Sequence, residues 1–262
     1  MYAVRPEVWP HLYATVSVVA VLVVLFRLFA KSWRTPLLIG LNLAILGSAF
    51  MVFFFRDPER STPDEPDWVF AGADGKIMSI RKVREPNHLK GEAIRVSIFL
   101  SLLDVHVNRA PISGRVIFCD YFPGKRHFTF LEKSSEENQH SEIVIANSRV
   151  TCLVTQIVGP VARRIVYWVR LGQMVQAGQR IGMMKFGSRL DIYVPADAVE
   201  EVLVKPGDFV QAGLTPVIRL KPESSSSDES VAPAEAAEIA PLPPIAETKP
   251  LPGEAGQEDN PE

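Results

Sequence analysis

Cysteine is scarce in this sequence. Of 262 residues, only Cys119 and Cys152 are cysteines, and they lie far apart. Their separation matches neither the paired spacing of zinc ligands nor a disulfide framework. No cluster of metal-ligating residues or phosphate-binding Gly-rich loop stands out elsewhere. We therefore expect no metal site, and we expect two inert, buried thiols in a reducing compartment.

Charge is absent from two long stretches, 12–26 and 37–55. With its apolar flanks each covers about 19 residues, and a helix of that length rises about 30 Å, which matches the hydrocarbon core of a bilayer. Two buried core helices are the alternative, although such runs rarely follow one another in a soluble domain. The first run lacks the cleavage site of a signal peptide. We predict that 1–60 is a membrane-associated hydrophobic hairpin, either spanning or entering one leaflet.

Bulky apolar residues are nearly absent from segment 222–262, which is rich in Ser, Pro, Ala and Glu. Such a composition cannot bury enough surface to fold, so we predict a disordered acidic tail. This tail holds ten acidic residues and one basic residue, which leaves 27 basic and 20 acidic residues in 1–221, a net charge of +7. A basic body suits an anionic lipid surface or a phosphate-bearing substrate. We expect no nucleic-acid partner.

Long amphipathic helices are absent from 61–221, and a period of two dominates instead. Apolar residues alternate or are β-branched in five runs, which are separated by glycines: 93–99, 113–118, 142–145, 149–154 and 189–194. Many short strands with turn signals between them predict a mainly β barrel or sandwich.

A short repeat lies within this segment. The sequence GQMVQAG at 172–178 returns as GDFVQAG at 207–213. Two such copies suggest two similar layers, as in the barrel-sandwich (lipoyl/biotinyl-like) carrier domains. The analogy also supports another function, because Met183-Met184-Lys185 resembles the turn on which biotin is carried. A membrane-anchored carrier or adaptor is therefore one candidate function.

The dipeptide Gly187-Ser188 separates an apolar run from the alternating run 189–194. Gly and Ser are common turn residues, so an ordinary turn is one reading. In the other reading the Ser188 hydroxyl attacks the carbonyl carbon of Gly187 and converts the amide to an ester. A glycine before the serine favours this, because it has no Cβ and tolerates a strained backbone. The dipeptide alone leaves both readings open.

Two further stretches carry candidate catalytic residues. Asp104 and His106 are two apart on a predicted strand, so their side chains should face the same side. A carboxylate beside an imidazole can orient a general base, although an ordinary buried hydrogen bond would look the same in sequence. Asp74 lies in the Gly-flanked stretch 71–76, which is also consistent with a simple turn.

Five motifs taken together, and in this order, resemble the short prokaryotic phosphatidylserine decarboxylases: Ala-Asp-Gly at 73–75, LDVHVNRAP at 103–111, Pro-Gly-Lys at 123–125, SEEN at 135–138 and FGSR at 186–189. The resemblance covers most of 56–221 and includes two hydrophobic segments in front. It implies that Gly187–Ser188 cleaves itself by serinolysis. The products would be a β chain, 1–187, and an α chain, 188–262, that begins with a pyruvoyl group made from Ser188.

The resemblance also implies site residues. Asp74, His106 and Ser188 would act together in cleavage, with Asp104 beside His106. Longer members of the family carry a second histidine where this chain has Arg109, so the role of that histidine is lost or falls on His106. We also predict that Arg109 and Lys125 bind the substrate phosphate.

The implied reaction needs no metal. The amine of phosphatidylserine would form a Schiff base with the pyruvoyl ketone, which accepts electrons as CO₂ leaves. A protonated His106 would return a proton to the α-carbon, and phosphatidylethanolamine would be released. A serine lipid with an archaeal ether backbone is an alternative substrate. The expected location is the cell membrane with the catalytic domain on the cytoplasmic side, and αβ units could pair as dimers.

Overall fold

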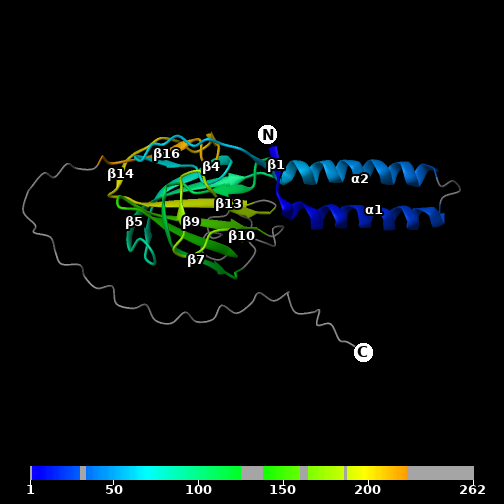
Figure 1. Cartoon of the computed structure of the whole chain (residues 1–262), viewed down its shortest axis with the longest axis horizontal. Helices are drawn as coiled ribbons and strands as arrows, with labels where there is room; N and C mark the ends of the chain where they lie inside the picture. The colour runs from blue at the N-terminus through cyan, green and yellow to red at the C-terminus, as the bar shows by residue number, and fades with distance from the viewer. Residues whose placement is uncertain (1, 30–33, 125–137, 160–164, 186–187, 223–262) are drawn as a thin grey trace, which may run out of the picture. The chain divides into compact units, whose positions relative to one another are not determined.

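A computed structural model describes residues 2–29, 34–124, 138–159, 165–185 and 188–222 (Figure 1). A 3₁₀ turn, η1 (Pro6–Val8), leads into helix α1 (Trp9–Phe29), and helix α2 (Arg34–Phe54) follows. The two helices run antiparallel, side by side. Most of their large apolar side chains are exposed, and both helices are long and apolar enough to cross a membrane. The sequence predicted these two helices.

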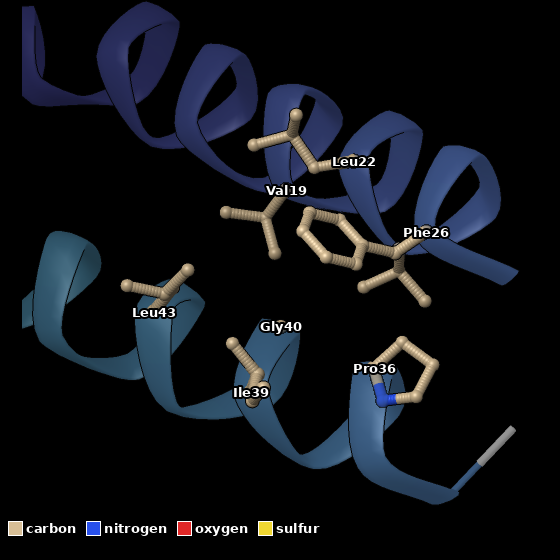
Figure 2. A pocket seen from close by; sticks show the side chains of 8 residues that line it. Val19, Leu22, Phe26, Pro36, Ile39, Gly40 and Leu43 are labelled. Atoms are coloured by element: carbon tan, nitrogen blue, oxygen red, sulfur yellow. The ribbon is translucent and has the colours of Figure 1, made fainter. Parts of the chain in front are cut away.

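Two glycines let α1 and α2 approach closely. A Cβ atom on Gly40 would lie 2.1 Å from Cγ2 of Val23, and one on Gly47 would lie 2.8 Å from Cγ2 of Thr15. Figure 2 shows the apolar hollow around Gly40, between side chains of the two helices. Small residues at a helix–helix contact are typical of packing in an apolar environment.

The rest of the described chain is mainly β, as predicted. Its largest sheet has eight antiparallel strands in the order β11-β7-β8-β9-β13-β5-β4-β15. The bounds are β4 Gly75–Glu85, β5 Gly91–Leu100, β7 Gly114–Phe122, β8 His140–Ala146, β9 Thr151–Val158, β11 Met174–Val175, β13 Ser188–Pro195 and β15 Phe209–Val210. The five predicted runs became β5, β7, β8, β9 and β13.

Three small sheets complete the described fold, in the orders β10-β12-β6, β14-β16-β3 and β1-β2. Their strands are β1 Tyr2–Val4, β2 Arg56–Pro58, β3 Trp68–Phe70, β6 Val107–Arg109, β10 Ile165–Tyr167, β12 Arg180–Met184, β14 Val199–Val202 and β16 Pro216–Leu220. The pair β1-β2 joins the start of the chain to the segment that follows α2.

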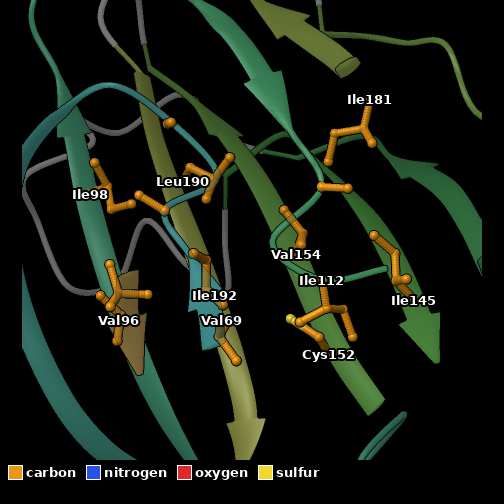
Figure 3. Close-up of a cluster of buried hydrophobic side chains, with 14 of the residues drawn as sticks. Val69, Val96, Ile98, Ile112, Ile145, Cys152, Val154, Ile181, Leu190 and Ile192 are labelled. Atoms are coloured by element: carbon orange, nitrogen blue, oxygen red, sulfur yellow. The ribbon is translucent and has the colours of Figure 1, made fainter. Parts of the chain in front are cut away.

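The core lies on one face of the large sheet. Leu190 and Ile192 of β13 pack there with Ile98 of β5 and Val154 of β9, because alternate residues of a strand share a face (Figure 3). Cys152 is buried in the same cluster, and burial raises the pKa of its thiol to about 12. Cys119 is half-buried, and both cysteines are free thiols.

The sequence repeat lies at the two edges of the large sheet. The first copy contributes β11, beside β7, and the second contributes β15, beside β4. The glycines that bound the copies all have positive φ: Gly172, Gly178, Gly207 and Gly213. A Cβ atom on Gly213 would lie 2.9 Å from Cα of Gly178, so the sheet curls until its two edges touch at these turns.

Candidate active site

Ser188 is the first residue of β13, in the middle of the large sheet. Its backbone is paired with Leu100 of β5 on one side and with Val158 of β9 on the other. The side chain is fully buried, and within the described part of the chain its Oγ has no hydrogen-bond partner. Gly187, the other predicted cleavage-site residue, lies outside the described residues. A buried hydroxyl without a partner is costly to keep, so it marks Ser188 as a candidate functional group.

His106 is also fully buried. Its ring packs against Phe54 at the end of α2, with ring centroids 4.2 Å apart. Nδ1 lies 2.9 Å from the backbone carbonyl oxygen of Asp104, an acceptor, so Nδ1 carries the hydrogen and Nε2 presents a lone pair. Among the described residues Nε2 has no partner. Burial lowers the pKa of His106 to about 4, which keeps the ring neutral and ready to accept a proton at pH 7.

Two chain connections hold His106 and Ser188 in the same region of the domain. The backbone N–H of Met184, the last residue of β12, donates to the carbonyl oxygen of His106 over 3.2 Å. Ser188 follows four residues later, within a chain reach of at most about 14 Å. The second connection runs through β5, whose last residue, Leu100, is paired with Ser188. His106 follows Leu100 by six residues in the chain. These connections support a joint role for the two side chains.

The prediction that Asp104 and His106 share a strand is wrong. Residues 101–104 form a tight turn, and β6 begins only at Val107. The Asp104 carboxylate accepts hydrogen bonds from the backbone N–H and the hydroxyl of Ser101, each 2.7 Å long. The backbone carbonyl of Asp104, and not its carboxylate, orients the imidazole. Asp104 therefore shapes the turn that leads to His106.

Asp74 is buried in a charged contact. Its two carboxylate oxygens accept hydrogen bonds from Arg60 over 2.6 and 2.7 Å, and Oδ1 also accepts from the backbone N–H of Ala212 over 2.8 Å. The hydroxyl of Ser113 accepts the equivalent bond from Ala177 in the other copy of the repeat. Asp74 thus has a structural role in its turn, and its negative charge still favours the protonated form of His106. Sequence analysis missed Arg60.

Replacing Arg60 by methionine should destabilise the protein by about 3 kcal/mol, because it leaves the buried Asp74 carboxylate without its cation. Arg60→Lys should lose less, since it keeps the charge but not the paired hydrogen bonds. Urea unfolding in detergent micelles measures both. Arg219→Met is the matched control, because the Arg219–Glu201 ion pair is 2.9 Å long but exposed, and it should change stability little. Equal effects at the two sites would contradict the prediction.

Arg109 does not have the environment predicted for a phosphate ligand. It is 4% exposed, and its guanidinium donates to the carbonyl oxygens of Gly178 and Pro58 and to Asp57. These bonds tie β6 to the repeat and to the segment after α2. The guanidinium is occupied by structural contacts, so we do not assign it to the substrate. Lys125, the other predicted phosphate ligand, lies outside the described residues.

A polar network that sequence analysis missed lies two residues beyond His106. The carbonyl oxygen Oδ1 of Asn108 accepts from Gln156 Nε2 over 2.6 Å, and Gln156 Oε1 accepts from the Ser141 hydroxyl over 2.7 Å. All three side chains are buried. These bonds fix the orientation of the Asn108 amide, and its Nδ2 group has no acceptor within the described ranges. Nδ2 is thus a buried donor in the region of the site.

The opposite face of β13 carries a buried ion pair. Arg189 donates to both carboxylate oxygens of Asp191, over 2.6 and 2.8 Å, and to the hydroxyl of Ser97 on β5 over 2.9 Å. All three residues are fully buried. Neighbouring residues of a strand face opposite sides. The ion pair therefore joins β13 to β5 on the face of the sheet away from the core, whereas Ser188 faces the core.

Comparison with known proteins finds related sequences. A family model described as phosphatidylserine decarboxylase matches residues 48–217. The chain is 45% identical over 172 residues to a phosphatidylserine decarboxylase proenzyme of Carboxydothermus hydrogenoformans, covering 66% of this chain and 80% of the relative. It is 41% identical over 215 residues to the proenzyme of the same name from Symbiobacterium thermophilum, covering 82% and 94%.

A third relative, from Methanopyrus kandleri, bears the provisional name archaetidylserine decarboxylase proenzyme. It is 40% identical over 196 residues, which cover 72% of this chain and 89% of the relative. The family model alone spans well over half of the chain. The chain therefore belongs to the phosphatidylserine decarboxylase family.

Proposed function

We propose that Ser188 and His106 cleave the chain at Gly187–Ser188 and then support decarboxylation at the new terminus. The chain is a phosphatidylserine decarboxylase, a pyruvoyl-dependent carboxy-lyase that is made as a proenzyme. One observation carries the residue assignment. The Ser188 hydroxyl and the His106 Nε2 are both fully buried, and neither has a hydrogen-bond partner among the described residues. We set aside the alternative of a membrane-anchored carrier or adaptor, because the chain belongs to a family of decarboxylases.

Cleavage requires a nucleophile and a base. The Ser188 Oγ attacks the carbonyl carbon of Gly187 and displaces the Ser188 nitrogen, which takes up the hydroxyl proton, so that an ester and a free amine replace the amide. Neutral His106 accepts the α-proton of Ser188, and the Cβ–Oγ bond breaks to release the Gly187 carboxylate. The resulting dehydroalanine is hydrolysed to a keto group with loss of ammonia. The products are the β chain, 1–187, and the α chain, 188–262.

The environment of Ser188 fits a residue that is converted to a pyruvoyl group. Its oxygen is buried and has no partner in the part of the chain that the structure describes. Because β13 is paired on both sides, the new α-chain terminus would stay between β5 and β9 after cleavage. When present, the pyruvoyl group supplies a ketone that binds the substrate amine and accepts the electrons released with CO₂.

His106 has a second task in decarboxylation. As a neutral base it accepts a proton from the substrate ammonium, and it later returns this proton to the α-carbon after CO₂ has left. A proton from solvent restores the ammonium of the product, so that each turnover takes up one proton and releases one CO₂. His106 starts neutral, because burial lowers its pKa to about 4, and it becomes an acid only after it has served as a base. The low pKa then favours return of the proton.

Ser188→Ala tests the cleavage site. This variant lacks the nucleophilic oxygen, so we expect one uncleaved chain of 29.1 kDa without a blocked keto terminus. Denaturing gel electrophoresis and intact mass spectrometry measure the outcome independently of decarboxylation. Ser113→Ala is the matched control, since it removes a serine hydroxyl that accepts a backbone hydrogen bond from Ala177, and it should still be cleaved. A processed Ser188→Ala protein would remove Ser188 from the proposal.

The pH dependence of cleavage tests the base. Because the pKa of His106 is lowered to about 4, its base form predominates well below neutral pH. We expect freshly translated precursor to cleave at a nearly constant rate from about pH 7.5 to about pH 5, and more slowly as the pH approaches 4. A pulse–chase experiment in a cell-free system measures this rate. A half-maximal rate near pH 6.5 would instead indicate an exposed histidine of ordinary pKa.

We further propose the lipid and the location of the reaction. The phosphatidylserine backbone is the favoured substrate, since the family model and two relatives carry that name. Parallel assays with phosphatidylserine and with archaetidylserine would separate the two lipid backbones. Helices α1 and α2 could anchor the protein in the cell membrane, with the catalytic domain on the cytoplasmic side.

The domain division is part of the same proposal. Segment 1–60 would form the membrane-associated hairpin, 61–221 the catalytic domain and 222–262 an acidic tail. The repeat at the two edges of the sheet supports a barrel-sandwich architecture for the catalytic domain, because the two turns make equivalent hydrogen bonds. The backbone N–H of Gly178 donates to the carbonyl oxygen of Ala110, and that of Gly213 donates to the carbonyl oxygen of Ala71.

A further inference from the structure

The turn before His106 has an unusual tip. Its two central residues, Leu102 and Leu103, are 47% and 66% exposed. Tight turns on a protein surface usually carry Gly, Asn, Asp, Ser or Pro at these positions. A pair of adjacent exposed leucines on a turn indicates a contact with an apolar partner.

This turn is rigid. The Asp104 carboxylate accepts two hydrogen bonds from Ser101, and the backbone N–H of Asp104 donates to the Ser101 carbonyl oxygen over 3.1 Å. The leucines between them are therefore held outward on a closed loop. Because the turn is already formed, little conformational entropy would be lost when the leucine side chains contact an apolar partner.

The turn is fixed to the end of α2. Arg56 donates to the carbonyl oxygen of Leu103 over 2.6 Å and to that of Phe53 over 2.9 Å. The guanidinium also lies 3.9 Å from the centre of the Phe53 ring. The exposed leucines thus continue the exposed apolar surface of α2, with an arginine between the two. An arginine at the end of an apolar helix is typical of the level of lipid headgroups.

The start of α1 supports the same level. Trp9 is 56% exposed at this end of the antiparallel pair, and tryptophan is enriched at membrane interfaces. The β1-β2 ladder and the bond from the Arg5 N–H to the Phe55 carbonyl oxygen join the start of α1 to the end of α2. The leucine turn, Arg56 and Trp9 therefore belong to one end of the helical pair.

We infer that Leu102 and Leu103 insert into the bilayer interface and place the mouth of the site among the lipid headgroups. This inference rests on the proposed membrane anchorage and lipid substrate. The inserted turn leads directly, through Asp104, to His106. A serine headgroup would then reach the site without its acyl chains leaving the bilayer.

Fluorescence quenching tests insertion without any need for activity. Leu103→Cys and Ile117→Cys are labelled with an NBD fluorophore in a Cys119→Ser background and reconstituted in phosphatidylserine/phosphatidylcholine vesicles. Ile117 is the matched control, since it is also exposed, at 48%, but lies far along the sheet from Ser188. Its neighbour Phe118 is aligned, across β8 and β9, with Tyr193 of β13. Tyr193 is five residues along β13 from Ser188, or about 17 Å.

We expect lipids that carry a shallow doxyl group to quench the label at position 103 and not the label at position 117. Equal quenching at both positions, or none at 103, would overturn the inference. So would a label at 103 that is blue-shifted in vesicles but is not quenched by any doxyl lipid, because that result would indicate a protein partner or a second copy. This test remains valid even if the proposed lipid reaction fails.

Kinetics test the consequence for the substrate. Leu102→Ser/Leu103→Ser should be cleaved into two chains like the wild type. It should show at least about a tenfold higher apparent KM for phosphatidylserine in vesicles, while kcat/KM for a water-soluble, short-chain phosphatidylserine stays within about twofold. Ile117→Ser should leave both values unchanged. An equal loss on both substrates would assign the leucines to the catalytic site instead and would overturn the insertion.

Discussion

His106→Ala is expected to remain a single chain and to slow self-cleavage by at least about 100-fold, the usual contribution of a general base. The wild-type ring is fully buried, with Nδ1 bonded to the Asp104 carbonyl oxygen and Nε2 left as an acceptor. No other described histidine has its acceptor nitrogen buried without a partner. Pulse–chase translation followed by a denaturing gel measures the cleavage rate, and decarboxylation should be absent from the uncleaved protein.

Two variants separate the base from the packing. His106→Asn keeps an N–H group that can donate to the Asp104 carbonyl oxygen, but it has no basic nitrogen, so it should fold and stay uncleaved. His88→Ala removes a histidine that is bonded to Glu142 over 2.9 Å, and it should be cleaved normally. Rapid cleavage of His106→Ala would assign the proton transfer to another group and leave His106 with a role in packing against Phe54.

The sequence predicted the strands that have one buried face. Apolar and polar residues alternate in 93–99 and 189–194 because β5 and β13 each have two different faces. These two strands could therefore be predicted without a structure. The short strands β6 and β10 have three residues each, too few for a period to show. They form because β12 lies between them and pairs with both, which is a long-range effect.

The site was predicted only as far as its local motifs allow. Ser188 and His106 were predicted from the family motifs, and both are buried, while their catalytic roles remain a proposal. Asp104 was misread, because a spacing of two places side chains together only in a strand, and here the chain turns to cap Ser101. The contacts of Arg109 could not be predicted from local motifs, because its partner Asp57 is 52 residues away. Arg60 was missed because its contact with Asp74, 14 residues away, depends on the fold.

Asp191→Asn is expected to destabilise the protein by about 3–5 kcal/mol. Arg189 is fully buried, and this change removes the negative charge that its guanidinium bonds twice. The Ser97 hydroxyl alone cannot compensate a buried positive charge. Urea unfolding in detergent micelles measures the loss. The proposed cleavage would leave β13 as the first strand of the α chain, so the variant α chain should also be released from a tagged β chain at lower urea concentration than the wild type.

A double variant distinguishes charge from shape. Arg189→Met/Asp191→Leu removes both charges and fills the space with apolar atoms, so it should recover most of the stability that Asp191→Asn loses. If the double variant is as unstable as the single one, the pair acts through its hydrogen bond to Ser97 and not through charge balance. Ser97→Ala then provides the decisive comparison.

A small effect of Asp191→Asn itself, below about 1 kcal/mol, would mean that water or another anion reaches Arg189, contrary to its complete burial. Because the ladders to β5 and β9 persist in every variant, any difference in α-chain release isolates what this ion pair adds to the retention of Ser188.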